Sequence, residues 1–272
     1  IDEELTRLAS EGPTPDELEQ FKSARELAML SSMQDVLSRA DSLNAYQFYF
    51  GEPDGFARDL KRYRSATAGS VLQWASRVLN PDARLITRVL PESPERGQVA
   101  RDTRPASAAP ATWAPPTPAT FTLSNGLRVM HFPKHDIPLV AMSVLLAPGS
   151  PIDDPDAPGL AALAAEMLDE GSGDLDALAF NDRVTSIGAT LSITSDAESA
   201  HVAMTVIERN LAEGVSLLAA AVTRPAMEQD DWDRVKSLHM ENLRQQDDNP
   251  TIVAARVSNR LLFGEASPLG RP

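Results

Sequence analysis

The chain has 272 residues, of which 42% are hydrophobic, and a net charge of −14 at pH 7. This length predicts a globular protein of about two domains with a sizeable core, and no apolar run is long enough to cross a bilayer. The charge argues against nucleic acid and against anionic membrane surfaces as partners, because both are themselves negative. Cysteine is absent, which excludes disulfides, thiolate zinc sites and cysteine catalysis.

Residues 1 to 90 are expected to be mainly helical. The run Pro13-Thr14-Pro15-Asp16-Glu17 predicts a helix start, because it offers a capping side chain and an acidic first turn. Further helices are expected around Val36 to Phe48 and after the cap Thr67-Ala68-Gly69-Ser70, where the turn Asn80-Pro81-Asp82 ends the last one. A strand is expected from Leu85 to Leu90.

A linker is predicted from residue 91 to 119. Seven of the 21 prolines lie between Pro91 and Pro118, among Ala, Ser, Thr and Arg. Such a composition favours an extended tether, and a strap that follows the surface is the alternative. Either structure separates residues 1–90 from residues 120–272.

Residues 120 to 272 mix strands and helices. Ser124-Asn125-Gly126 predicts a hairpin with a primed turn, because Asn-Gly supplies positive φ angles. Ile137 to Ala147 is apolar on both alternations, which predicts a strand covered on both faces. Further strands are expected at Ala189–Thr194 and Ala200–Val206, and helices at Asp174–Ile187, Leu211–Thr223 and Trp232–Arg244. This order predicts an α+β fold whose mixed or antiparallel sheet carries helices on one face.

The segment from Gly159 to Leu168 has two interpretations. Its apolar residues recur at the spacing of any helix that lies on a core. The segment also has the frame of an inverted zinc motif, H-x-x-E-H, in which two imidazoles lie at i and i+4 and the catalytic carboxylate directly precedes the second. Here these three positions are Ala162, Ala165 and Glu166. The second interpretation is therefore a non-catalytic copy of a zinc-peptidase helix.

An internal repeat indicates modules of a little over 200 residues. The run from Asp16 to Ser23 is similar to the run from Asp230 to Ser237, with Lys22 and Lys236 offset by 214 residues. Phe50-Gly51-Glu52 and Phe263-Gly264-Glu265 follow at an offset of 213. A shared helix pair at one distance is typical of repeated modules, although amphipathic helices can also be similar by chance.

Two stretches resemble the pitrilysin/insulinase family of zinc metallopeptidases. Pro158-Gly159-Leu160-Ala161 before the motif positions, and Met167-Leu168 with Gly171-Ser172 after them, resemble the family pattern G-L-A-H-L-L-E-H-M-L-x-x-G-T. The order T-x-x-S-V-x-x-x-A-x-x-x-L-N-P-D, then a strand, resembles the end of a family module. The resemblance implies four α+β modules in two linked halves that close around an unfolded peptide, with zinc in the first module only.

On this resemblance the chain is a fragment of two incomplete modules. Residues 1–90 are the C-terminal part of one metallopeptidase-like module, 91–119 the linker, and 120–272 a non-catalytic module that lacks H-x-x-E-H. The family's third ligand, a Glu, falls at or beside Val235 when Leu243-Arg244-Gln245 and the helix stop at Asn249-Pro250 are aligned. The degenerate motif positions are therefore Ala162, Ala165, Glu166 and Val235, and no catalytic or metal-binding residue is expected. Glu166 is better explained by a salt bridge than by catalysis.

The four histidines do not form a metal site in the sequence. His131 and His135 are separated by Pro133, which excludes a regular helix between them, and they are expected to be solvated at a strand end. His201 lies on the polar alternation of a strand, and His239 lies on an acidic helix. No pair has metal-ligand spacing near a carboxylate on one helix.

Two functions follow from the resemblance. The first is a fragment of a zinc-dependent endopeptidase that contributes a chamber wall and peptide contacts while another module holds the zinc. The second is a structural or partner-binding relative with no active module, as in the core proteins of respiratory complexes. We expect no cofactor in this fragment, a peptide substrate bound through the parent's other modules, no nucleic acid and no membrane insertion. The resemblance is compatible with a homo-oligomer and with a hetero-oligomer. A periplasmic or other extracytoplasmic bacterial location rests on the resemblance alone.

Overall fold

The computed structural model describes residues 2–79, 87, 116–146, 153, 159–196, 199–265 and 267–270. The helices are α1 (Asp2–Ser10), α2 (Pro15–Ser32), α3 (Val36–Phe50), α4 (Phe56–Arg64), α5 (Ala68–Val78), α6 (Leu160–Glu166), α7 (Ala177–Ser186), α8 (Leu211–Thr223), α9 (Gln229–Asp247) and α10 (Pro250–Phe263), with the 3-10 turns η3 (Glu208–Asn210) and η4 (Pro268–Gly270). The strands are β1 (Ala119–Thr122), β2 (Arg128–His131), β3 (Leu139–Leu146), β4 (Gly171–Ser172), β5 (Leu175–Asp176), β6 (Ala189–Ser195) and β7 (Ala200–Ile207). The predicted α+β class is confirmed.

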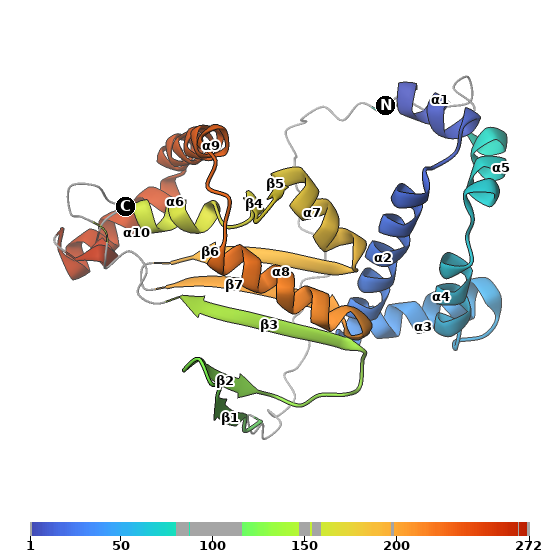
Figure 1. Cartoon of the computed structure of the whole chain (residues 1–272), viewed down its shortest axis with the longest axis horizontal. Coiled ribbons are helices and arrows are strands. Elements are labelled where there is room, and N and C mark those ends of the chain that lie inside the picture. The colour runs from blue at the N-terminus through green and yellow to red at the C-terminus, as the bar shows by residue number, and fades with distance from the viewer. Residues whose placement is uncertain are drawn as a thin grey trace, which may run out of the picture.

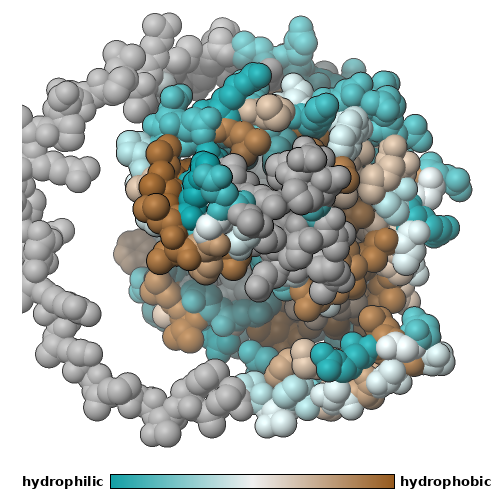
Figure 2. All heavy atoms as spheres, turned by 90° about the vertical axis from the view of Figure 1, so that its left-hand side faces the viewer, coloured by the Kyte–Doolittle hydropathy of each residue, from teal (hydrophilic) through white to brown (hydrophobic). Residues whose placement is uncertain are grey.

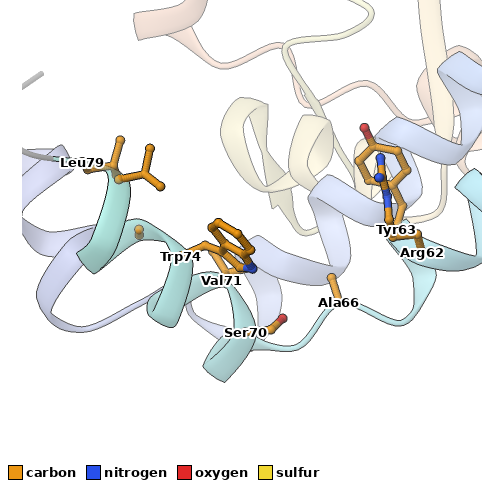
Figure 3. A pocket seen from close by; sticks show the side chains of 9 residues that line it. Arg62, Tyr63, Ala66, Ser70, Val71, Trp74 and Leu79 are labelled. Atoms are coloured by element: carbon orange, nitrogen blue, oxygen red, sulfur yellow. The ribbon is translucent and has the colours of Figure 1, made fainter. Parts of the chain in front are cut away.

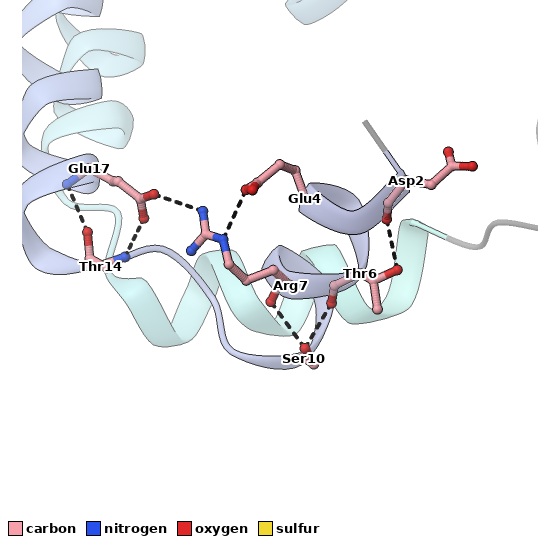
Figure 4. A network of polar contacts seen from close by, with 7 residues as sticks. All are labelled: Asp2, Glu4, Thr6, Arg7, Ser10, Thr14 and Glu17. Atoms are coloured by element: carbon pink, nitrogen blue, oxygen red, sulfur yellow. Dashed lines mark hydrogen bonds and ion pairs between the residues drawn. The ribbon is translucent and has the colours of Figure 1, made fainter.

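The N-terminal helices begin where local chemistry favours it. Thr14 accepts a hydrogen bond from the Glu17 N–H, and the Glu17 carboxylate accepts one from the Thr14 N–H at 2.7 Å, which together form a capping box for α2. Arg7 of α1 contacts the same Glu17 at 2.8 Å and also Glu4 at 3.0 Å (Figure 4). This network fixes the angle at which α1 meets α2.

The central sheet is antiparallel with the order β3-β7-β6. Helices α6, α7 and α8 pack on one of its faces (Figure 1). The core on that face is formed by the inward alternation of the strands and the apolar sides of these helices, including Met142, Val202, Met204, Val206, Phe180, Val184, Leu217 and Leu218. Helices therefore cover one face, as the sequence predicts.

The opposite alternation of the same strands forms what we call the open face. It consists mostly of small or polar side chains, namely Ala141, Ser143 and Leu145 of β3, His201, Ala203 and Thr205 of β7, and Thr190, Ser192 and Thr194 of β6. The strand at Ile137 to Ala147 was predicted to be covered on both faces, and this prediction is wrong. β3 is an outer strand of this sheet, and its alternate residues, such as Leu145 at 60% exposure, face outward.

Helix α2 covers one end of the open face. Its residues Leu27 and Leu30 form a small core with Ile207, against which Leu139 also packs. The approach is close at Gly188, where a Cβ atom would lie 3.2 Å from the Ser23 carbonyl oxygen. The N-terminal helices are thus packed directly against the sheet of residues 120–270.

A buried ion triad lies at this junction. Glu26 of α2 is only 4% exposed and accepts hydrogen bonds from Arg64 of α4 at 2.5 and 3.2 Å. Arg209 of η3 donates to the same carboxylate, at 3.0 Å through Nη2 and also through Nη1. Burial alone raises the pKa of Glu26, but the hydrogen bonds from Arg64 and Arg209 outweigh it and hold the pKa below its ordinary value.

The hairpin of β1 and β2 forms as predicted, but with a different turn. Leu123 and Leu127 close a three-residue loop, and the Gly126 N–H donates to the Leu123 carbonyl at 2.9 Å. Gly126 has a φ of 88°, whereas Asn125 has no positive φ and instead accepts a hydrogen bond from the Leu127 N–H. The predicted primed turn is wrong, because a loop of this length needs a left-handed residue only at its last position.

One helix was not predicted from the sequence, and two predicted segments lie mostly outside the described residues. Helix α4 was not predicted, because it spans only nine residues and five of them are charged, although Phe56, Leu60 and Tyr63 recur at the i, i+4, i+7 spacing of an amphipathic helix. Apart from Thr87, the strand expected at Leu85–Leu90 lies outside the described residues, as does most of the linker at 91–119, so both stay predictions.

The internal repeat corresponds to two helix pairs. Helix α9 begins at Gln229, 214 residues after Pro15, and α10 begins at Pro250, 214 residues after Val36. Both second helices end at a glycine with positive φ, Gly51 at 76° and Gly264 at 79°. The side of the molecule that carries α9 and α10 exposes several apolar patches (Figure 2), and Val257, Leu261 and Leu262 of α10 are all more than half exposed.

Candidate functional site

The motif segment folds as the short helix α6. Gly159 precedes it with a φ of 94°, and the Asp153 carboxylate accepts hydrogen bonds from the N–H groups of Gly159 and Ala161, each at 2.8 Å. Such a carboxylate satisfies backbone donors that a helix start leaves unpaired. The motif positions Ala162, Ala165 and Glu166 therefore lie on a helix with a fixed N-terminus.

Helix α9 packs against α6 and brings the fourth motif position to the same place. Val235 is the buried residue of α9, at 5% exposure, and Ala165 is the buried residue of α6, also at 5%. Val235 and Glu166 line one cavity of about 260 Å³. The structure thus places Val235 beside the motif helix, and Ala165 and Val235 are the two positions at which the sequence resemblance predicts carboxylates in the family.

One polar contact joins the two helices at the rim of this cavity. His239 Nδ1 lies 2.9 Å from Glu166 Oε1, and the side chains are 21% and 45% exposed. This contact agrees with the interpretation of Glu166 as a salt-bridge partner. The pairing of His239 with Glu166 was not predicted from the sequence, although His239 lies one helical turn after Val235 and so shares its face of α9.

Charged residues surround the rest of the cavity. Arg234 contacts Glu170, and it contacts Asp231 at 3.0 Å. Asp169 also lines the cavity, and burial, followed by the neighbouring carboxylate of Glu170, raises its pKa above the ordinary value. The cavity therefore carries an unfavourable negative charge that Arg234 only partly offsets.

Zinc does not fit the residues at these four positions. A zinc site needs three or four nitrogen, oxygen or sulfur ligands, but Ala162, Ala165 and Val235 have no ligand atom. Glu166 and His239 together supply two at most. In the described part of the chain no group of three or more His, Asp or Glu side chains is arranged to hold a metal ion.

The other histidines lie apart from this site. His131 and His135 are exposed and line a different cavity of about 610 Å³ next to β3. His201 lies on the open face, where its Nε2 is 3.1 Å from the Ser199 hydroxyl. A further apolar pocket of about 480 Å³ lies along α5, with Val71 and Trp74 among its lining residues (Figure 3). It holds no constellation of catalytic groups.

The comparisons with known proteins agree with the motif frame. The sequence model of "Insulinase (Peptidase family M16)" matches residues 129–267, slightly more than half of the chain. The chain belongs to this family. The matched range includes α6 and α9 and therefore all four degenerate motif positions. A search of curated proteins found no match.

Two solved structures are similar to the chain. One is the crystal structure of a peptidase M16 inactive domain from Pseudomonas fluorescens, with 23% identity and a TM-score of 0.54 over 57% of this chain and 38% of that one. The other is a protease from Helicobacter pylori, with 20% identity and a TM-score of 0.48 over 52% of this chain and 34% of that one. The first supports the fold, and the chain spans well under half the length of either structure.

None of the helices in the described part of the chain is both long and apolar enough to span a membrane.

Proposed function

We propose that residues 120–272 form a non-catalytic M16 module that contributes the wall of a peptide chamber, while a different module carries out zinc-dependent hydrolysis. The observation that carries the proposal is the apolar character of the motif positions. Ala165 and Val235 are both buried, and α6 packs on α9, where the family pattern has a catalytic and a ligating carboxylate.

The open face supports the second part of the proposal, contact with a peptide. Its Thr and Ser side chains offer hydroxyl groups, and its Ala side chains are small. An extended peptide can therefore lie on this face whatever the side chains of the peptide are. In this proposal residues 1–90 are the end of the preceding module and 91–119 the linker between two halves. The parent's substrate is an unfolded peptide.

The test is to rebuild the metal site. Ala162→His, Ala165→Glu and Glu166→His restore the helix motif, and Val235→Glu adds the third ligand. We expect the wild-type chain to contain no stoichiometric zinc, the triple variant to bind zinc weakly, and the quadruple variant to bind it markedly more tightly, as measured by metal analysis and calorimetry. Ser237→Glu replaces Val235→Glu in the control, because it also adds one negative charge, but at an exposed position of the same helix.

Two outcomes would contradict the proposal. The first is tight zinc binding by the wild-type chain that Glu166→Gln removes. The second is hydrolysis of a fluorogenic peptide by the wild-type chain that the same substitution abolishes. If the whole parent protein contains no intact zinc motif and hydrolyses no peptide, the structural or partner-binding alternative is correct.

A further inference from the structure

The cavity of about 610 Å³ lies at the end of the sheet where β3 begins and β7 ends (Figure 1). Its lining includes the first residues of β3 and Thr205 of β7, which pairs with Ala141 in register. The β2–β3 connection, Glu208 of η3 and Gln34 of the α2–α3 turn line the rest of it. A cavity of this volume is typical of sites that hold a small molecule.

Part of the lining of this cavity is apolar. Ile137 and Leu139 line the cavity and also pack against the small core that contains Ile207. Phe132 of the β2–β3 connection adds an aromatic side chain. The apolar part of a ligand would therefore leave water when it enters this cavity, which favours binding.

The other lining residues are charged and polar. Lys134 supplies an ammonium group, Glu208 supplies a carboxylate, and Gln34, His131 and His135 supply further hydrogen-bonding groups. In the part of the chain that the structure describes, none of these five side chains takes part in a hydrogen bond or an ion pair. All five can therefore bind a ligand without first breaking a contact within the chain.

The cavity beside α6 provides a contrast. It is also lined by acidic and basic side chains, but there Arg234 is paired with Glu170 and with Asp231. Lys134 and Glu208 line one cavity and are not paired with each other. The larger cavity therefore offers one cationic and one anionic group to a ligand, whereas the smaller one satisfies its arginine internally.

The backbone beneath these two charged residues is restrained. Lys134 directly follows Pro133, and the connection enters β3 through Pro138, whose ring fixes its own φ angle. The Pro138 carbonyl accepts a hydrogen bond from the Glu208 N–H at 3.0 Å, which ties the β2–β3 connection to η3. A site whose backbone is held before binding loses less conformational entropy when a ligand arrives.

We propose that this cavity binds a small zwitterion with an apolar side chain, namely a free α-amino acid. Its carboxylate contacts Lys134, its ammonium group contacts Glu208, and its side chain lies against the apolar lining around Ile137. Glu208 would repel a simple anion and Lys134 a simple cation, whereas a zwitterion is attracted by both. Thr205 and Ala141 belong to the open face, opposite α6, so this inference does not rest on the proposed function.

The first experiment titrates the full chain, with ¹³C-labelled methionine methyl groups, with L-leucine. Met130 lines the cavity, whereas Met240 is on α9. The Met130 signal, assigned with Met130→Leu, should shift in a saturable way, and the Met240 signal should not move. The expected dissociation constant is on the order of 1 mM, as suits a ligand of so few atoms. No saturable shift of Met130 would overturn the proposal.

Matched ligands and variants then test each charge. Leucinamide lacks the carboxylate and N-acetyl-leucine lacks the ammonium group, and each should bind about fivefold more weakly than L-leucine. Lys134→Met should weaken the binding of L-leucine but not that of leucinamide, and Glu208→Gln should weaken the binding of L-leucine but not that of N-acetyl-leucine. Lys236→Met and Glu241→Gln, which remove the same charges from exposed positions of α9, are the controls and should change nothing.

The pattern across these ligands decides the outcome. Equal affinity of the wild-type chain for all three ligands would show an apolar cavity without charge recognition and would overturn the zwitterion site. The same loss for all three ligands in Lys134→Met or in Glu208→Gln would show that the charge acts on the cavity and not on the ligand, which also overturns it. The zinc experiment decides the non-catalytic role independently of both results.

Discussion

Helices α2 and α9 hold equivalent places in the internal repeat but contact the rest of the chain through opposite chemistry. α2 buries a carboxylate, Glu26, between two arginines, whereas α9 buries Val235 against α6 and keeps its polar contact, Glu166 with His239, at the surface. Glu26 is the only charged side chain that is buried among the described residues. The two helices therefore hold equivalent positions in the repeat, but only α2 carries a buried charge.

The largest effect is expected from placing a carboxylate where α9 is now apolar. Val235→Glu should destabilise the chain by about 3 kcal/mol in urea unfolding, because the new charge lies beside Glu166, Asp169 and Glu170 and lacks a partner. Ser237→Glu, which also adds one negative charge but at an exposed position of α9, should stay within about 0.5 kcal/mol of wild type. Similar losses for the two variants would show that the α6–α9 contact does not depend on apolar packing.

The opposite change on α2 should have the next largest effect. Glu26→Ala removes the carboxylate that both arginines bind, and we expect a loss of about 2 kcal/mol in the free energy of unfolding. The loss is below that of a fully buried pair because both guanidinium groups are half exposed and regain water. Glu19→Ala on the same helix, which removes only an exposed pair with Lys22, is the control and should change little.

The contribution of Glu26 should also depend on pH. Its pKa is lower in the folded chain than its ordinary value of about 4.3, so the stabilisation is complete above that value and decreases as the pH falls through the folded pKa. The stability difference between wild type and Glu26→Gln should therefore be constant at neutral pH and shrink in acid. A difference that grows below pH 4 would contradict the assigned direction.

The contrast between the two helices also separates the features that the sequence predicts from those that it does not. Local patterns predicted α2, α8, the hairpin and the strands β6 and β7, because caps, turns and alternation are encoded within a few residues. The exposure of β3 and the pairing of Glu26 with Arg209 could not be predicted. Both depend on which elements pack together in the folded chain. Glu26 and Arg209, for example, are 183 residues apart, and a single sequence carries no direct signal of such a contact.

The same reasoning applies to the candidate site. The motif frame identified Ala162, Ala165 and Glu166, and an aligned helix end suggested Val235, which the structure places at the same cavity as Glu166. His239 was missed, because pairing with Glu166 requires the packing of α9 on α6. That these positions bind no metal stays a prediction until zinc is measured.

A smaller effect with the opposite sign is expected at Asp169. Because its pKa is raised by burial and by Glu170, its ionised form is unfavourable in the folded chain at neutral pH. Asp169→Asn should therefore stabilise the chain by up to about 1 kcal/mol at pH 7 in urea unfolding. The gain should begin to fall as the pH drops through the folded pKa, and it should vanish below the ordinary pKa, where Asp169 is neutral in both the folded and the unfolded chain. Asp174→Asn, on an exposed residue nearby, should give no such pH-dependent gain.

The smallest effect is expected where α6 and α9 meet at the surface. The Glu166–His239 contact is partly exposed and is an ion pair only when His239 is protonated, and exposed ion pairs contribute between about 0.2 and 1 kcal/mol. A double-mutant cycle with Glu166→Ala and His239→Ala should give a coupling energy at the lower end of that range, and the coupling should weaken in 1 M salt. A coupling near that of Glu26 with Arg209 would mean that α9, like α2, is attached by charge, and that the apolar packing of α9 on α6 is secondary. A weak coupling leaves this packing as the main interaction between the two helices.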